Sequence, residues 1–153
     1  MTSQKKTPQE LADLIGRTAA QRDLAARRLG IELVEMGPGR AVLRMTVQPD
    51  MVNSHGTCHG GIIFTLADSA FGYACNSFNR NSVAQHASIE FLRPVMPGTE
   101  LTAVAELRST TGRSSIYDMT VSDADGNAVA LFRGLARTIS GETVPGLTPP
   151  DGA

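Results

Sequence analysis

The residues best suited to chemistry lie in one segment, Asn53 to Gly61, which runs into an apolar stretch that contains Asp68. If this stretch is a helix that begins at Gly60 and Gly61, its first main-chain N–H groups have no acceptor within the helix. Such donors favour negative charge and can serve as an oxyanion hole. Asp68 is an acid among apolar residues, and a buried carboxylate is costly unless it is hydrogen-bonded or useful. The segment therefore predicts either an oxyanion site with an acid or a structural aspartate whose hydrogen bonds are satisfied.

Helix geometry limits how Gly60 and Asp68 can act together. They lie eight residues apart, which is about 12 Å along a helix axis, so one substrate carbonyl cannot touch both in the same chain. If they cooperate, the acid must be the Asp68 of a second chain whose helix runs antiparallel. A two-fold dimer supplies two such sites at once. The spacing thus favours a site shared between two chains, provided that both groups act on one substrate.

Other kinds of site fit parts of this segment less well. A nucleophilic triad of Cys58, His59 and Asp68 is disfavoured because helical rise separates His59 from Asp68 by about 13 Å. A zinc site on His55, Cys58 and His59 lacks an obvious fourth ligand, and the glycines disfavour one helix across both histidines. The Gly-x-Ser-x-Gly turn of serine hydrolases does not occur. We expect His86 to be a buried or half-buried polar residue, and no metal or other cofactor is predicted.

Two helical pieces open the chain. Thr7, Pro8 and Glu10 have the pattern of a capping box with proline at the first helical position. A second helical piece through Asp23–Leu29 would end at Gly30.

From Ile31 onward, apolar residues alternate as they do in strands. The predicted strands are Ile31–Met36, Ala41–Val47, Val83–Leu92, Glu100–Arg108, Arg113–Ser122 and Ala128–Ile139. The run Gly60–Cys75 is too long for one strand and apolar on every side, which predicts a buried helix. Short connections favour antiparallel pairing of successive strands. We therefore predict an α+β fold in which about six antiparallel strands form one curled sheet around one long helix. A helical segment at 1–30 precedes this domain of 31–140, and a flexible tail at 141–153 follows it.

The composition suits a single domain without a nucleic-acid or membrane partner. The chain has 153 residues, of which 41% are hydrophobic, and its 14 basic and 15 acidic side chains leave a formal net charge of -1. The run Gly60–Cys75 is shorter than the about 20 residues of a membrane span, and Met1–Gln9 lacks the apolar run of a secretory signal. The expected location is the cytoplasm. Cys58 and Cys75 would lie about 20 Å or more apart on a helix, so we expect two buried thiols rather than a disulfide.

At this point the segment resembles a known family. Asn53 followed by His59-Gly60-Gly61, and then Asp68 within Thr-Leu-Ala-Asp, is similar to the hotdog-fold acyl-CoA thioesterases of the phenylacetic acid degradation (PaaI-like) type. The similarity extends over about 31–139 and includes Phe91-Leu92-Arg93-Pro94. It implies the hotdog fold, dimers whose sheets join edge to edge, and pairing of dimers into a homotetramer.

The resemblance also implies roles for particular residues. The Gly60 N–H would polarise the thioester carbonyl, and Asn53 would position substrate or water. Asp68 from the other subunit would be the general base or the nucleophile. Gly61 would allow close approach of the thioester, and His59 would shape the loop.

The remaining substrate contacts are candidates by residue type. The phosphates of coenzyme A need basic or main-chain donors, for which Arg113 with Ser114 and Ser115 are the first candidates and Arg80 and Arg93 the next. The acyl pocket is expected to be apolar and to draw on Phe64, Phe71 or Met51.

The implied activity is hydrolysis of aryl-CoA thioesters, of the phenylacetyl-CoA or hydroxyphenylacetyl-CoA type, to free acid and coenzyme A in phenylacetate degradation. A thioester lacks the resonance of an ester, so one carboxylate and one strong donor should suffice without a cofactor. Two alternatives stay open: an enoyl-CoA hydratase or dehydratase on the same fold, and a non-catalytic acyl-CoA-binding module. A hydratase would use a catalytic histidine, for which His59 with Asp68 is a poorly matched pair.

Overall fold

Three α-helices and one short 3-10 helix lie in residues 5–147, the part of the chain that the computed structural model describes. They are α1 (Pro8–Arg22), α2 (Leu24–Arg28), the 3-10 helix η1 (Pro49–Met51) and α3 (Gly60–Asn76). At the start of α1, the Thr7 hydroxyl accepts the Glu10 N–H at 3.2 Å, and the Glu10 carboxylate accepts the Thr7 N–H at 2.8 Å. This capping box confirms the predicted helix start.

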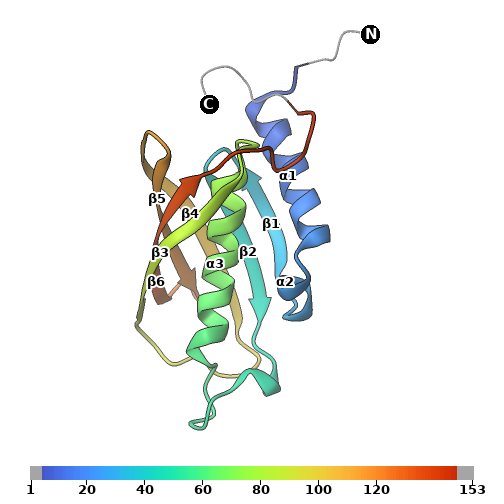
Figure 1. The fold of residues 1–153 in the computed structure, drawn as a ribbon. Helices are drawn as coiled ribbons and strands as arrows, with labels where there is room; N and C mark the ends of the chain where they lie inside the picture. The colour runs from blue at the N-terminus through green and yellow to red at the C-terminus, as the bar shows by residue number, and fades with distance from the viewer. Residues whose placement is uncertain (1–4, 148–153) are drawn as a thin grey trace.

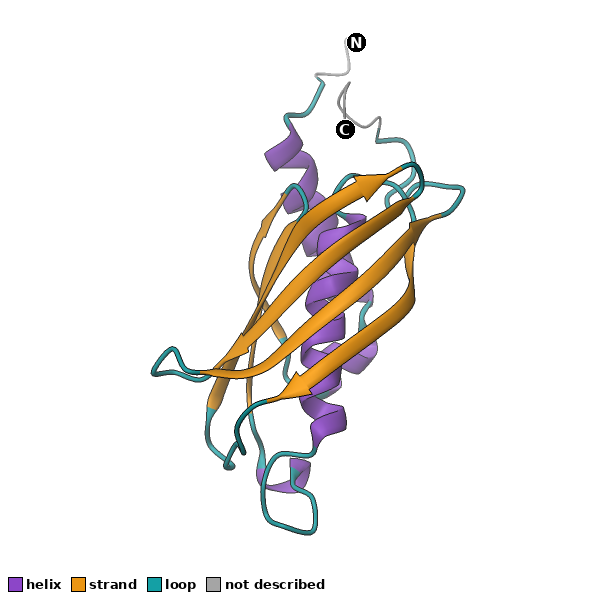
Figure 2. Cartoon of the chain, turned by 90° about the vertical axis from the view of Figure 1, so that its left-hand side faces the viewer, coloured by secondary structure: helices purple, strands orange, loops and turns teal. Residues whose placement is uncertain are grey.

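The described residues also form six strands. They are β1 (Glu32–Gly37), β2 (Arg40–Thr46), β3 (Ser82–Phe91), β4 (Glu100–Thr111), β5 (Ser114–Ser122) and β6 (Ala128–Thr138). All pairings are antiparallel, in the order β1-β2-β4-β5-β6-β3. The single sheet curls around α3 (Figures 1 and 2). The predicted architecture, about six antiparallel strands around one long helix, is confirmed.

The strand order differs from the sequence-based expectation at one place. Consecutive strands β3 and β4 were expected to pair, but β3 pairs with β6, with Phe91 opposite Ala130, and β4 pairs with β2. The reason lies in the connection between them. Pro94 cannot continue the strand, and the Val95 carbonyl accepts the Cys58 N–H at 2.7 Å. The chain is thereby tied to the start of α3 and crosses to the opposite part of the sheet (Figure 1).

The inner face of the sheet packs on α3. Ala41 and Met45 of β2 point inward and are at most 1% exposed, as the two-residue period predicts. Near the middle of α3, the Phe71 ring lies 5.6 Å from the Tyr117 ring of β5. Gly134 of β6 makes room for this ring, because a Cβ there would come within 2.5 Å of Phe71. The core therefore fixes α3 firmly against the sheet.

The two edges of the sheet differ. At one edge α1 lies along β1, where Gly16 permits close contact with Met36 and the Gln9 amide donates to the Met36 carbonyl at 2.7 Å. At the other edge, β3 pairs with β6 and has no second strand partner among residues 5–147. Val83 and Phe91 of β3 are 46% and 53% exposed. One edge is thus covered, and the other presents main-chain groups and apolar side chains that can pair with another chain.

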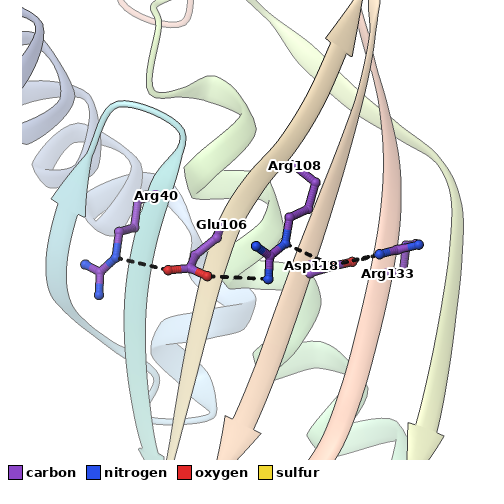
Figure 3. Close-up of polar contacts among 5 residues, drawn as sticks. All are labelled: Arg40, Glu106, Arg108, Asp118 and Arg133. Atoms are coloured by element: carbon purple, nitrogen blue, oxygen red, sulfur yellow. Dashed lines mark hydrogen bonds and ion pairs between the residues drawn. The ribbon is translucent and has the colours of Figure 1, made fainter.

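The outer face of the sheet carries a row of alternating charges, formed by Arg40, Glu106, Arg108, Asp118 and Arg133 (Figure 3). Asp118 accepts from Arg133 at 2.6 Å and from Arg108 at 3.0 Å. These hydrogen bonds, that from Arg133 above all, lower the pKa of the Asp118 carboxyl. Exposed pairs of this kind contribute about 0–1 kcal/mol each, so the row makes the face polar without adding much to stability.

Polar side chains close the C-terminal end of α3. The Asn76 side chain donates to the Ser82 carbonyl at 3.1 Å and accepts the Ser82 N–H at 2.9 Å. Asn79 is fully buried, has a φ of 59°, and donates to the carbonyls of Val144 and Leu147 at 3.1 and 2.6 Å. It also accepts the Val144 N–H at 2.8 Å. These bonds tie the chain after β6 to the end of the helix.

The predicted segment boundaries and the flexibility of the tail at 141–153 stay predictions, and residues 148–153 lie outside the described part. Both cysteines, Cys58 and Cys75, are buried free thiols, as expected. No helix within residues 5–147 combines the length and hydropathy that crossing a membrane requires.

Candidate active site

The loop before α3 is held in shape by Asn53. Its side-chain oxygen accepts the main-chain N–H groups of His55 and Thr57 at 2.9 and 3.3 Å, and its own N–H donates to the Thr57 carbonyl at 2.8 Å. The Asn53 amide also donates to the Thr57 hydroxyl at 3.1 Å. Turns of this kind are typical of asparagine, whose side chain bonds the main chain a few residues on. Asn53 therefore orders the loop that leads into the helix.

His59 caps the helix, and this fixes its tautomer. Its Nδ1 accepts the Gly61 N–H at 3.0 Å, and its own N–H donates to the Met51 carbonyl at 2.8 Å. An accepting ring nitrogen carries no proton, so the ring hydrogen of the neutral imidazole is on Nε2. These two hydrogen bonds join His59 to the first turn of the helix and to Met51.

Gly60 and Gly61 differ in what their N–H groups do. The Gly61 N–H is used by His59, whereas the Gly60 N–H has no acceptor among residues 5–147. An unpaired N–H at the first residue of a 17-residue helix is a donor at the positive end of the helix dipole. Gly60 is therefore the free donor at this helix start.

Gly60 and Asn53 line one cavity of about 370 Å³. Its other walls come from the start of α3 and from the chain that leaves β3. They are formed by Thr57, Cys58, Ile63, Phe91, Leu92, Arg93, Pro94 and Val95. The structure thus brings together three of the residues that the sequence proposed, Asn53, Gly60 and Arg93, and adds to them the rest of the segment that crosses after β3.

Asp68 lies further along α3, about 12 Å from Gly60 by helical rise. The sequence suggested a carboxylate inside an apolar helix, but Asp68 is exposed, on the part of α3 that the sheet leaves uncovered. Neighbouring groups still displace part of its water, and this desolvation raises the pKa of the Asp68 carboxyl. The negative charge of Asp23, between α1 and α2, raises it further. Within one chain the acid is therefore accessible but does not reach the cavity at Gly60.

Arg113 and Ser114 are not brought near Gly60 within one chain. They lie at the turn between β4 and β5, where Arg113 donates to the Thr138 carbonyl at 3.2 Å. The neighbouring Ser115 lines a small cavity with Cys75, so this turn lies toward the C-terminal end of α3. A helix of this length spans about 25 Å, which separates the turn from the cavity at the other end.

Several other expectations change with the structure. His86, expected to be at least half-buried, is exposed on β3. Phe71, a candidate for the acyl pocket, is 1% exposed and belongs to the core, whereas Phe64 is half-buried with its ring 4.9 Å from that of Phe132. Met51, another candidate for the acyl pocket, is buried, with 7% of its surface exposed.

The cavity wall at Phe91 was missed as a functional candidate. The motif Phe91-Leu92-Arg93-Pro94 was noticed as part of the resemblance. The signal available in the sequence was a large aromatic residue at the end of a strand, two positions before Arg93-Pro94.

The cysteine and metal alternatives find no support in the geometry. Burial raises the pKa of the Cys58 thiol, which disfavours the reactive thiolate. Within residues 5–147 there is no group of three or more His, Cys, Asp or Glu side chains placed to hold a metal ion.

A long helix clasped by a curled antiparallel sheet is the architecture of the hotdog fold. Residues 55–130 match the family model described as the thioesterase superfamily. The chain is 44% identical over 121 residues to acyl-coenzyme A thioesterase PaaI of Escherichia coli, an alignment that covers 79% of this chain and 86% of that protein. The chain belongs to the thioesterase superfamily, among its PaaI-like acyl-CoA thioesterases.

Solved structures agree with this assignment. The E. coli PaaI protein from the phenylacetic acid degradation operon superposes with a TM-score of 0.87 at 40% identity, covering 89% of this chain and 99% of that one. A mutant of phenylacetic acid degradation protein PaaI from Thermus thermophilus superposes with a TM-score of 0.74 at 33% identity, covering 76% of this chain and 100% of that one.

Proposed function

We propose that this protein hydrolyses aryl-CoA thioesters, of the phenylacetyl-CoA or hydroxyphenylacetyl-CoA type, to the free acid and coenzyme A in phenylacetate degradation. The similarity to E. coli PaaI supports the substrate class. The observation that carries the chemistry is the unpaired Gly60 N–H in a cavity beside Asn53. A thioester carbonyl oxygen bound there would accept a hydrogen bond from Gly60. That bond would strengthen as negative charge develops on the oxygen during the reaction.

The reaction needs a base or nucleophile opposite that donor. Along one route, the ionised Asp68 removes a proton from water, the water oxygen attacks the carbonyl carbon, and the Gly60 N–H holds the resulting oxyanion. Collapse of the intermediate breaks the C–S bond, and the thiolate of coenzyme A leaves and takes up a proton. Along the other, the Asp68 carboxylate attacks the carbonyl carbon, the C–S bond breaks and the thiolate of coenzyme A leaves and is protonated; water then hydrolyses the mixed anhydride to the free acid and the regenerated Asp68 carboxylate. Both routes use the same two protein groups.

Asp68 must come from a second chain for either route. Within one chain, about 12 Å separates it from Gly60. The open edge of β3, with Val83 exposed on it, supports a two-fold dimer in which two β3 strands pair. The exposed side of α3, which carries Asp68, would then face the partner's α3. If these helices run antiparallel, the partner subunit's Asp68 lies opposite Gly60.

The same arrangement bears on the other proposed site residues. His59 would keep the loop and the Gly61 N–H in place, and Gly61 would leave room for the thioester. Arg113 and Ser114 would reach the phosphates of coenzyme A only from the partner chain, whose C-terminal end of α3 would extend past Gly60. We further propose a cytoplasmic homotetramer made from two such dimers, for which light scattering should report about 65 kDa, four times the 16.2 kDa chain mass.

Release of free thiol from a panel of CoA esters tests the function. Phenylacetyl-CoA and hydroxyphenylacetyl-CoA should give the highest kcat/KM, and Asp68→Ala should lower it by orders of magnitude in a chain that still folds. Loss of enoyl absorbance from an enoyl-CoA without thiol release would indicate a hydratase instead. Tight binding of acyl-CoA without turnover would indicate a binding module.

Mixed dimers test the shared site. Asp68→Ala and Asn53→Ala chains should each be inactive alone. When they are unfolded, mixed and refolded together, hybrid dimers should recover part of the activity, because one of their two sites has both residues intact. Confirmed hybrids without recovery would contradict a site built from two chains.

A further inference from the structure

Phe91 has an unusual position for a large apolar side chain. It is the last residue of β3 and is 53% exposed. Its ring tip lies against the helix start, since a Cβ built on Gly60 would be 3.0 Å from Phe91 Cζ, 3.2 Å from Cε1 and 3.5 Å from Cε2. The ring therefore touches the residue that carries the free donor, while half of its surface stays open.

The main chain on both sides of Phe91 is fixed. Phe91 pairs with Ala130 of β6, and the next N–H, that of Leu92, donates to the Val129 carbonyl at 2.9 Å. Further along, Val95 is tied to Cys58. The ring itself makes no ring-to-ring contact with another aromatic side chain among residues 5–147. A rigid backbone thus presents an aromatic ring that has no aromatic partner in its own chain.

The ring lies on the wall of the cavity that holds Asn53 and Gly60. In a phenylacetyl thioester a single methylene joins the carbonyl carbon to the aryl ring, whose centre is about 4 Å from that carbon by ordinary bond lengths. Because the Phe91 ring lies against Gly60, an aryl group that turns toward it from a carbonyl bound at the Gly60 N–H comes within reach of Phe91, since aromatic pairs interact at about 4.5–7 Å between ring centres.

We propose that Phe91 is the specificity-determining residue of this site and that its exposed ring stacks on the aryl group of the acyl-CoA. The inference rests on the proposed function and deepens it, because it names the group that selects aryl over aliphatic acyl chains. Phe71 cannot do this, since it is 1% exposed and packed in the core.

The ratio of kcat/KM for phenylacetyl-CoA to that for hexanoyl-CoA tests the proposal. Phe91→Leu keeps an apolar side chain but loses the flat ring, so the ratio should fall about three- to tenfold, the range that an aromatic pair supplies. Phe91→Tyr keeps the ring and should retain the wild-type ratio. Val34→Ala is the matched control, because Val34 is 52% exposed but lies on β1, outside the cavity. That variant should leave the ratio unchanged.

Gel filtration of each variant reports its oligomeric state, and thermal unfolding reports whether it is folded. Together they distinguish a loss of assembly or folding from a loss of substrate selectivity. If the leucine variant fails to fold, Phe91→Met carries the same expectation. An equal fall for both substrates would overturn the role of Phe91 and leave the thioesterase activity standing. Failure of the wild-type protein to release thiol from any CoA ester would overturn the proposed function, and the role of Phe91 with it.

Discussion

The two ends of α3 are both polar, but their polar groups are used in opposite ways. At the C-terminal end, the buried Asn79 side chain makes three hydrogen bonds to the chain after β6, and Asn76 bonds the main chain of Ser82 in both directions. At the N-terminal end, the Gly60 N–H has no acceptor among residues 5–147, and midway along the helix Asp68 stands exposed with a raised pKa.

This difference separates the polar groups that stabilise the fold from the polar groups that are available for catalysis. A satisfied buried polar network rigidifies a fold, and losing one member leaves the others unpaired. An unpaired donor and a desolvated carboxylate do not stabilise the fold, but they are ready to bind a developing negative charge and to take up a proton. Changes at Asn76 and Asn79 should therefore lower stability, and changes at Gly60 and Asp68 should lower turnover.

The strongest test of this contrast is Asp68→Asn. The amide cannot take up a proton or attack, so thiol release should fall about 100- to 10,000-fold. The fold should not suffer. Desolvation raises the folded-state pKa of Asp68, so ionisation of this carboxyl opposes folding at any pH above its unfolded pKa. Removing it at neutral pH should leave the thermal midpoint unchanged or raise it by up to about 3 °C.

Two outcomes would contradict the prediction that Asp68 serves turnover rather than stability. A drop in the thermal midpoint of Asp68→Asn comparable to its loss of activity would mean that Asp68 is a structural residue. Turnover within tenfold of wild type would remove it from the mechanism.

The opposite result is expected at Asn79. Asn79→Gly keeps the positive φ, which glycine adopts freely, but removes three hydrogen bonds from a fully buried site. The free energy of unfolding should fall by about 2–4 kcal/mol, while kcat/KM well below the melting range stays within about twofold of wild type. Asn79→Ala should lose about 1 kcal/mol more because it adds left-handed strain.

Chemical denaturation and thiol release on the same samples check this prediction. Equal stability of the glycine and alanine variants would show that backbone strain at residue 79 is unimportant. A large loss of turnover in both Asn79 variants would mean that the C-terminal end of α3 also affects catalysis. The separation of stability from turnover would then be wrong.

Two glycines on α3 sharpen the comparison further. A Cβ at Gly60 would be 3.0 Å from the exposed ring tip of Phe91, whereas one at Gly72 meets nothing within 4 Å. Gly60→Ala should lower kcat/KM about 10- to 100-fold, because the methyl group and the displaced ring occupy space beside the donor. Gly72→Ala should instead stabilise the helix by up to about 1 kcal/mol with unchanged turnover. If Gly60→Ala were fully active, close approach at Gly60 would not matter.

Much of this arrangement is local in sequence and could be predicted. The apolar run Gly60–Cys75 became a helix that ends one residue later, at Asn76. The alternation in Ala41–Val47 correctly marked the inner face of β2. Periodicity and capping act over a few residues, so a single chain reports them directly.

The strand order was less accessible. The connection after Phe91 is long enough either to turn back or to cross, and only the bond between Val95 and Cys58, together with pairing to β6, distinguishes the two. For that reason Phe91 was not recognised as a wall of the cavity. The exposure of Asp68 was equally hidden, because the curl of the whole sheet decides which side of α3 it leaves open.

The smallest expected effect concerns the influence of Asp23 on the pKa of Asp68. Asp23 raises the pKa of Asp68 through its negative charge and caps α2 by accepting the Ala26 N–H at 3.0 Å. Asparagine caps helices as well as aspartate does, so Asp23→Asn removes the charge and keeps the cap. A carboxyl that loses a negative neighbour gives up its proton more easily, so the pKa of Asp68 falls. The acid limb of the kcat/KM profile should then move to lower pH with little change at its plateau. Asp125→Asn, the same charge change in the turn between β5 and β6, should leave the limb in place, and an equal shift in both variants would mean that overall charge, rather than Asp23, sets the ionisation of Asp68.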